Sequence, residues 1–485
     1  MEKLTHGEML TLEMYDDGSN TDPPDYRTWR FGYMFADLQR NEDEHLLYPS
    51  KDTVDALKRL GDAMQDPTED VIPGVPVPAI HTFFGQFVDH DITLERGSRN
   101  IQLDKEQPLR LEEVAKQIVN SRSPDLDLDS VYGPDINGAR PPRDPDNQEK
   151  FLLFKVEGEA GLPRGKDVWH DFPRLPDGIK QVAQIGDSRN DENIITAQLH
   201  IAFLRAHNAL VDRGFRFDEA RKLLIQHYQW IVLDEFLEKI ADPNVVKLVR
   251  YRGAKFFDPP ARSFFIPLEF AVAAYRFGHS KVRPAYNHFN EKQKNGGLDQ
   301  LFRTDRRLSG DWVIEWPSFL DAANPERFPR PIDTSLTWQL LSLPKLKEVA
   351  LQPNLAIRNL LRGYLLRMPT GQAVAKAMAS QGILPMTEKQ IGSVANDIPG
   401  QYKVLTETDF LTKTPLWFYI LAEAAYYSRG HHLGPVGSTI VAEVLIGVLR
   451  HSTYSILSDA QWKPTLGDTP SKFTLKDLLK LAGVF

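Results

Sequence analysis

Apolar residues recur with helical spacing along most of this 485-residue chain, and this repeat restricts the possible folds more than any other feature. Strand-like alternation is rare, and KFLLFKVEG at residues 150–158 is its best candidate. The sequence therefore predicts a mainly α protein with little β-structure. The segments with the helical repeat are residues 52–64, 79–95, 110–120, 190–214, 217–240, 265–279, 335–344, 355–366, 371–381, 415–428, 436–450 and 474–484.

Long connections that contain proline join these segments, at residues 68–78, 141–145 and 323–332. None of them separates two self-contained patterns, and the sequence shows no internal repeat. We therefore expect one large helical domain over residues 51–485. The first 50 residues are rich in Asp, Asn, Pro and aromatic side chains, and we expect residues 1–50 to form an N-terminal arm.

The composition excludes several classes of protein. The chain has no cysteine, which excludes disulfides, zinc–thiolate sites, iron–sulfur clusters and thiolate-ligated haem. The net charge is −8 with both signs interspersed, which is not the pattern of a nucleic-acid-binding protein. The longest apolar stretch, residues 438–449, is too short to span a bilayer and contains Glu443. No signal peptide is visible, so we expect a soluble protein without a transmembrane segment, either cytoplasmic or exported by a non-classical route.

The segment FGQFVDHDIT, residues 84–93, places Asp89, His90 and Asp91 in a row between apolar flanks. Acidic side chains are seldom buried without a partner. Successive residues of a helix point about 100° apart, so these three side chains face three directions and each needs its own partner. Gln86 lies one turn before His90 and shares its face. Taken alone, the segment is equally typical of a helix that ends in a solvated acidic pair.

A second acidic segment, SRSPDLDLDSVYG, covers residues 121–133. Ser123, Asp125, Asp127 and Asp129 alternate along it and lie on one side of an extended loop. Alternating oxygen donors suit a hard cation such as calcium, although the EF-hand pattern is absent. The segment is either a solvated acidic turn or a calcium site that a carboxylate from elsewhere, such as Asp91, completes.

A third polar cluster opens the helical segment at residues 186–214. Asp187 or Ser188 is a suitable N-cap. Arg189 and Glu192 then share one face of the first turn, where the simplest interpretation is a surface ion pair of little energetic value.

Two more helices carry polar residues at regular spacing. The apolar segment at residues 271–283 ends in Arg276 and His279, and Asn359 and Arg362 lie one turn apart on another helix. A lone histidine at a helix end, or inside a helix like His200, is more often structural than a ligand.

These segments together resemble the peroxidase–cyclooxygenase superfamily, which includes the mammalian haem peroxidases. The motifs G-Q-x-x-D-H-D, D-x-D-S-V-Y-G, R-x-x-E and R-x-G-H occur in the family's order between residues 83 and 450. Residues 414–449 are similar to the bacterial branch of the family. The resemblance implies a single helical domain around a buried haem b, and an oxidoreductase of the peroxidase class.

The resemblance also implies roles for the residues that match the motifs. His90 corresponds to the distal catalytic histidine, Gln86 to a residue that helps to hold water or halide beside it, and Arg189 to a cation that stabilises the leaving oxygen. His279 corresponds to the ligand of the haem iron. Asn359 corresponds to the hydrogen-bond partner of that ligand.

The remaining matches concern the haem edge and calcium. Arg276 and Arg362 correspond to arginines near the haem propionates. Asp89 and Glu192 correspond to residues that can form ester bonds to the haem. The implied calcium ligands are Asp91, Ser123, Asp125 (through its backbone carbonyl), Asp127 and Asp129.

The implied reaction is the reduction of hydrogen peroxide and the oxidation of halide, thiocyanate or small aromatic donors through a ferryl intermediate. In this reaction a neutral histidine acts first as a base and then as an acid. One departure from the mammalian enzymes is Asn193, which stands after Glu192 in place of the methionine that forms a sulfonium link in one branch.

Two alternatives compete with a peroxidase. A fatty-acid oxygenase of this superfamily would carry a tyrosine three residues before the proximal histidine. That position holds Arg276 here, and Tyr275, four residues before His279, should face a different direction on a helix. The second alternative is a non-catalytic, calcium-stabilised haem-binding protein, which would have no need of Gln86, His90 and Arg189 together.

Overall fold

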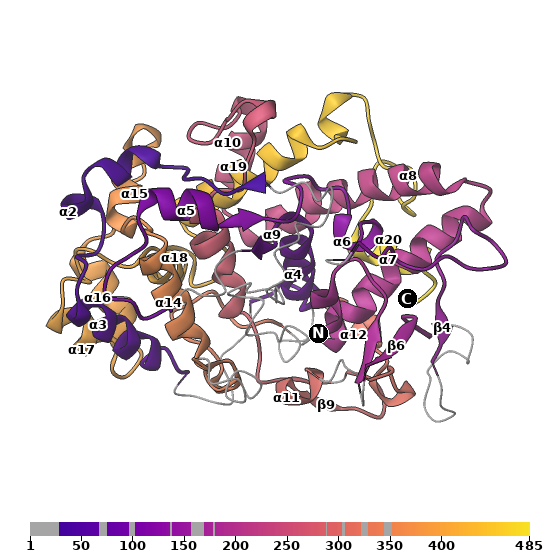
Figure 1. Ribbon diagram of the computed structural model, residues 1–485, viewed down its shortest axis with the longest axis horizontal. Helices are drawn as coiled ribbons and strands as arrows, with labels where there is room; N and C mark the ends of the chain where they lie inside the picture. The colour runs from indigo at the N-terminus through magenta and orange to yellow at the C-terminus, as the bar shows by residue number, and fades with distance from the viewer. Residues whose placement is uncertain are drawn as a thin grey trace.

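Helices dominate the computed structural model, and its strands are short (Figure 1), which confirms the predicted mainly α fold. The described residues are 29–66, 75–96, 102–135, 138–156, 169–177, 180–287, 289–302, 306–321, 328–343 and 352–485. The α-helices are α2 (Glu42–His45), α3 (Lys51–Asp62), α4 (Ile80–Ile92), α5 (Leu111–Gln117), α6 (Asp129–Tyr132), α7 (Ile194–Asp212), α8 (Phe217–Trp230), α9 (Leu237–Ile240), α10 (Pro243–Arg252), α11 (Leu298–Leu301), α12 (Trp316–Leu320), α14 (Leu355–Leu365), α15 (Gly371–Ala377), α16 (Glu388–Asn396), α17 (Gln401–Glu407), α18 (Leu416–Ser428), α19 (Pro435–His451) and α20 (Leu475–Leu481).

The strands pair locally and antiparallel. They are β1 (Trp29–Arg30), β2 (Glu95–Arg96), β3 (Val119–Asn120), β4 (Phe154–Lys155), β5 (His170–Asp171), β6 (Arg174–Asp177), β7 (Lys180–Ala183), β8 (Ala285–Asn287) and β9 (Asn295–Gly297). The order β1–β3–β2 places both Trp29 and Glu95 opposite Asn120. This small sheet joins the chain that leaves α4 to the acidic segment that follows β3. The predicted strand at residues 150–158 contains β4, and its last two residues lie outside the described part of the chain.

Helix α4 lies near the middle of the molecule, with α3, α14, α16 and α17 to one side and α7, α8 and α20 to the other (Figure 1). Phe83, Phe84 and Phe87 of α4 are buried. The ring of Phe87 stacks on Phe203 of α7 with centroids 4.7 Å apart. Apolar burial on this scale drives helix packing, and it fixes α4 as a core helix.

Two predicted helices are interrupted in the structure. The helix expected at 217–240 continues from α8 through a π-helical turn, Ile231–Phe236, into α9. The helix expected at 265–279 is a π-helix, η5 (Glu269–Ala273), followed by a 3₁₀-helix, η6 (Ala274–His279). The buried carboxylate of Glu269 accepts the backbone N–H groups of Met34 and Phe35 at 2.8 and 3.0 Å. Such local changes of helix type often mark functional sites.

The end of the predicted N-terminal arm packs on the helical body. Tyr33 donates its hydroxyl to the carbonyl of Leu366 at 3.0 Å, in addition to the bonds that Met34 and Phe35 donate to Glu269. Residues 1–28 of the arm lie outside the described residues. Among the helices that are described, none combines the length and the apolar character needed to cross a bilayer.

Candidate active site

A cavity lies between α4 and η6. Thr82, Gly85, Gln86 and Asp89 keep partial exposure on the otherwise buried α4 and line this cavity. Their spacing places them on one helical face. From the opposite element the wall receives, among others, Tyr275, Arg276, Gly278, His279 and Lys281, and His90 and Glu95 complete the α4 end.

His90 is held through one ring nitrogen. Its Nδ1 lies 2.7 Å from Oδ1 of Asn190, and Nδ2 of that amide lies 3.1 Å from Nδ1 of His200. Burial lowers the pKa of His200 to about 3, so His200 is neutral at pH 7 and its Nδ1 can accept from the amide. The amide is thereby oriented with its oxygen toward His90, whose Nδ1 must donate. Nε2 is therefore the atom of His90 that can take up a proton.

Arg189 is fully buried beside His90 and is absent from the described lining of the cavity. Its guanidinium donates to both carboxylate oxygens of Asp187, at 2.9 and 2.7 Å, and to the carbonyl oxygens of His90 and Thr93. Asp187 also accepts the backbone N–H of Arg189 as N-cap of the 3₁₀-helix η2 (Ser188–Asp191). The expected helix therefore starts later, at Ile194, with Asn193 as its cap.

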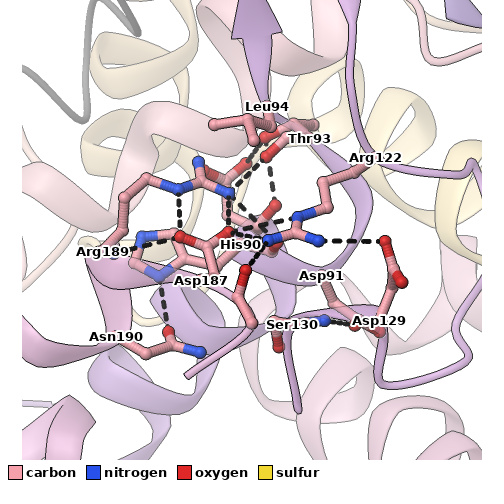
Figure 2. Close-up of polar contacts among 12 residues, drawn as sticks. His90, Asp91, Thr93, Leu94, Arg122, Asp129, Ser130, Asp187, Arg189 and Asn190 are labelled. Carbon is pink, nitrogen blue, oxygen red and sulfur yellow. Dashed lines mark hydrogen bonds and ion pairs between the residues drawn. The ribbon is translucent and has the colours of Figure 1, made fainter. Parts of the chain in front are cut away.

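Arg122 links this cluster to the acidic segment, as Figure 2 shows. It donates to Asp187 at 2.8 Å and to Asp129 at 3.0 Å. Burial raises the pKa of Asp187, but the charges of Arg189 and Arg122 outweigh this and hold that pKa well below its usual range. A continuous ionic chain thus runs from Asp129 through Arg122 and Asp187 to Arg189.

Asp91 points away from the cavity toward the acidic segment. Its two carboxylate oxygens accept the backbone N–H groups of Leu128 and Ser130 at 3.1 and 3.2 Å (Figure 2). Burial and the nearby charge of Asp129 raise the pKa of Asp91. Burial and the charges of Asp91, Asp125 and Asp129 likewise raise the pKa of Asp127. Four of the residues predicted to hold calcium, Asp91, Asp125, Asp127 and Asp129, therefore lie near one another.

Several of these residues already have protein partners. Asp125 accepts the backbone N–H and the hydroxyl of Thr453 at 2.9 and 2.8 Å, and Asp129 pairs with Arg122. Ser123 is partly buried and its hydroxyl has no hydrogen-bond partner. Within the described ranges, no group of three or more His, Cys, Asp or Glu side chains is arranged to hold a metal ion. The acidic segment gathers carboxylates without forming a finished metal site.

His279 lies at the end of η6 and is partly exposed to the cavity. Its Nδ1 lies 2.9 Å from the amide nitrogen of Asn359, whose oxygen accepts from Arg276 at 2.8 Å. A histidine that binds iron through Nε2 carries its proton on Nδ1 and needs an acceptor there. The partner is the predicted one, but the amide must turn before its oxygen can accept from His279.

Two predicted haem-contacting residues lie away from the described cavity wall. Arg362 is fully buried and forms an ion pair with Glu95. Glu192 is buried and is likewise absent from the lining, whereas its neighbour Asn193 belongs to it. Of the two predicted ester-forming residues, only Asp89 borders the cavity. Thr93 donates its hydroxyl to that carboxylate at 3.0 Å.

Tyr275 borders the cavity beside Arg276, so the different direction that helical spacing indicated does not remove it from the site. Its ring stacks on Phe270 with centroids 4.6 Å apart. Its hydroxyl is buried without a hydrogen-bond partner among the described residues, 4.0 Å from where a Cβ would stand on Gly85. The 3₁₀ geometry of η6 allows both neighbours to reach the same cavity.

Sequence patterns missed three residues of the site. Arg122 lies inside the acidic segment at residues 121–133, where its being a single cation among aspartates could have indicated its role. Asn190 follows Arg189 directly, but nothing in the motif separates it from a surface residue. Lys281 follows His279 by two positions, and only its burial in the cavity wall reveals it.

Comparisons with known proteins find similarity to peroxidases. Residues 99–314 match the family model described as animal haem peroxidase. A peroxidase-like protein of Margaritifera margaritifera is 29% identical over 192 residues, in a match that covers 37% of this chain and 23% of that protein. The chain thus spans about a quarter of that relative's length.

Two solved structures share the fold. Peroxidase A of Dictyostelium discoideum superposes with a TM-score of 0.61 at 15% identity, over 99% of this chain and 97% of that chain. A fatty acid alpha-dioxygenase of Oryza sativa has a TM-score of 0.55 at 12% identity, over 84% of this chain and 75% of the other. At these identities the likeness concerns the fold alone. The family match and the curated relatives show that part of this chain is similar to the animal haem peroxidases.

Proposed function

We propose that this chain is a haem peroxidase that reduces hydrogen peroxide and oxidises small anionic or phenolic donors such as halide, thiocyanate or phenols. The observation that carries the proposal is that His90 and His279 line the same cavity. Each ring has an amide at its Nδ1, from Asn190 and Asn359 respectively. Such partners fix the ring orientation that proton transfer and metal ligation require.

The side chains at the cavity suit a haem in their chemistry. His279 would bind the iron, Arg276 would face the propionates, and a Cβ added at Gly278 would meet no atom within 4 Å, so open space lies against η6. The cavity holds about 90 Å³, below the ~300–1,000 Å³ of most ligand pockets. Its walls must therefore separate to admit a porphyrin. When bound, the haem supplies the iron that reacts with peroxide and stores the oxidising equivalents.

The chain's own residues then manage the protons. Nε2 of His90 accepts a proton from peroxide in the cavity and returns it to the oxygen that leaves as water. Asn190 keeps Nδ1 of His90 protonated, so the same nitrogen serves both steps. Arg189 holds the backbone of His90 and places a permanent cation behind it, which favours the charge that develops as the O–O bond breaks.

The first experiment is a stopped-flow study of the haem-loaded protein mixed with hydrogen peroxide, then with bromide, thiocyanate or a phenol. We expect a fast spectral change that a donor reverses. His90→Ala should slow the reaction with peroxide by about 10²–10⁴-fold while the absorption spectrum of the bound haem persists. His431→Ala, at an exposed position, is the control. Unchanged peroxide turnover in His90→Ala would contradict the proposed role of His90, whereas a Soret band of the wild-type protein that does not respond to peroxide would support a haem carrier.

A fatty-acid oxygenase is the second candidate, because the hydroxyl of Tyr275 borders the cavity. Oxygen uptake that needs linoleate, and that Tyr275→Phe abolishes, would favour it over a peroxidase. The presence of Arg276 at the position where the oxygenases carry their tyrosine supports the peroxidase.

We also propose that calcium binds between Asp91 and the acidic segment, with Ser123, Asp125, Asp127 and Asp129 as the further ligands. The support is that the Asp91 carboxylate is bonded to the backbone of the acidic segment at Leu128 and Ser130. Burial and the charges of Asp91, Asp125 and Asp129 raise the pKa of Asp127 there, and crowded carboxylates favour a cation between them. Calcium should raise the melting temperature of the wild-type protein but not that of Asp127→Asn. Asp146→Asn, in an exposed turn, is the control, and an equal calcium response in Asp127→Asn would exclude this site.

Asp89 is the better candidate for an ester bond to the haem, because it borders the cavity and Glu192 does not. Acidified organic solvent should release more haem from Asp89→Asn than from Glu192→Gln. Equal release would argue against this assignment.

A further inference from the structure

Lys281 is a buried cation in the wall of the cavity. It is 1% exposed, and its Nζ has no hydrogen-bond partner or ion pair within the described residues. The backbone around it is well held, because its N–H donates to Gly278 and its carbonyl accepts from Arg330, both at 3.1 Å. The residue is therefore fixed in place, and only its ammonium lacks a partner.

An isolated buried ammonium is unfavourable, because the charge loses its hydration and gains nothing in return. At Lys281 no hydrogen bond or ion pair within the described residues offsets that loss. The contacts within the described residues do not explain why a lysine is buried beside this cavity.

Two other cations near the cavity, Arg276 and Arg362, do have hydrogen-bond or ion-pair partners. Arg276 donates to Asn359 and to the carbonyl of Ala271. Arg362 pairs with Glu95. Lys281 therefore differs from both in having its charge available to an anion that enters the cavity.

We propose that Lys281 binds a carboxylate of the ligand that fills this cavity. The inference rests on the proposed function, since a haem would bring two propionates to the site. A carboxylic acid substrate offers the same chemistry, so the experiment must separate the two sources. An ammonium–carboxylate pair with this little access to water is a strong, charge-assisted contact.

The test compares haemin with haemin dimethyl ester, whose propionates carry no charge. Both probes are titrated into the cofactor-free wild-type protein and the variants Lys281→Met and Lys281→Arg, with the Soret band as readout. We expect wild type to prefer haemin by roughly tenfold to a hundredfold. Lys281→Met should lose most of this preference and Lys281→Arg should keep it. Lys247→Met, at an exposed position of α10, is the control and should match wild type.

The melting temperature of the cofactor-free protein is a second readout, and it should rise in the variant that loses its preference for haemin. In the cofactor-free protein, Lys281→Met removes an uncompensated buried charge and leaves a side chain of similar length. We therefore expect the melting temperature to rise, by roughly 2–4 °C or more. A purely structural lysine would show the reverse, a fall in melting temperature together with an unchanged preference for haemin.

The remaining outcomes separate the two sources of carboxylate. If Lys281→Met keeps the preference for haemin, the haem-loaded proteins are titrated with linoleate and benzoate. Tighter binding by wild type would assign Lys281 to an organic acid. Equal behaviour of Lys281→Met and wild type in every titration would overturn the proposal. If wild type binds no haemin at all, the proposed function fails, and the thermal shift that linoleate gives in wild type and Lys281→Met still decides the role of Lys281.

Discussion

The two walls of the cavity differ in how far their charges are compensated. On the α4 wall, Asp187 lies between Arg122 and Arg189, and that ionic chain holds the backbone of His90. On the η6 wall, Asn359 faces His279 through its nitrogen, and Lys281 has no anionic partner in the described part of the chain.

The difference indicates which wall is complete before a ligand arrives. The α4 wall is preorganised, which is how protein groups stabilise a reaction without reorganising during it. The η6 wall holds charge and hydrogen-bonding capacity that only a ligand can satisfy. We therefore expect substitutions on the α4 wall to weaken the cofactor-free protein more than substitutions on the η6 wall.

The largest effect should come from Asp187→Asn. The change leaves the buried cations Arg122 and Arg189 without their shared carboxylate, and breaking a buried ion pair in this way costs about 3–5 kcal/mol. Urea unfolding of the cofactor-free protein measures the loss. Asp55→Asn, which alters an exposed pair with Lys51 on α3, should cost less than about 1 kcal/mol. Similar losses in both variants would contradict the ionic chain as a structural element.

An intermediate effect is expected from Asn359→Leu on the η6 wall. Arg276 loses the acceptor at Oδ1 and His279 loses its amide partner, which should cost about 1–3 kcal/mol. The same unfolding experiment measures it, with Asn396→Leu at the exposed end of α16 as the control. A loss larger than that of Asp187→Asn would reverse the comparison between the two walls.

The smallest effect near neutral pH is the loss of stability on acidification. The pKa of His200 is lowered to about 3 by burial, against about 6.5 in an unfolded chain, so the unfolded state binds the extra proton between these values. Stability should therefore fall as pH falls from about 6.5 toward 3, with a slope of up to about 1.4 kcal/mol per pH unit.

His200→Gln should reduce that slope, and His431→Gln is the control for the loss of one imidazole. Unfolding free energies at pH 6.5, 5.5 and 4.5 decide the question. Part of the slope should persist, because burial also lowers the pKa values of His207 and His227 to about 4. A slope in His200→Gln equal to that of wild type would mean that His200 does not orient Asn190 as a neutral acceptor.

Much of the candidate site could be predicted because it lies in short motifs. On a helix, the side chains of the consecutive residues Asp89, His90 and Asp91 must point in three different directions. In the structure Asp89 borders the cavity, His90 contacts Asn190 and Asp91 contacts the acidic segment. Helical spacing also located α4, α7 and α14 to within a few residues. Local periodicity is sufficient for such predictions, since it depends on residues only a few positions apart.

Other features could not be predicted, because long-range contacts decide them. Nothing local shows that Arg362 pairs with Glu95, that Arg189 bonds Asp187 and the carbonyl of His90, or that Tyr275 reaches the cavity. The π- and 3₁₀-helical turns of η5 and η6 likewise accompany the burial of Glu269 beneath the N-terminal arm.

The amino-acid sequence by itself determined the helical class of this protein and the identities of the side chains that could bind a haem and peroxide. Which of those side chains face the cavity was decided by the tertiary structure. The physical reason is that a charge or an amide acts only through the partners that surround it, and these partners come from distant parts of the chain. Lys281 shows this most directly, because its sequence position is unremarkable and only burial without an anion makes it a candidate for binding one.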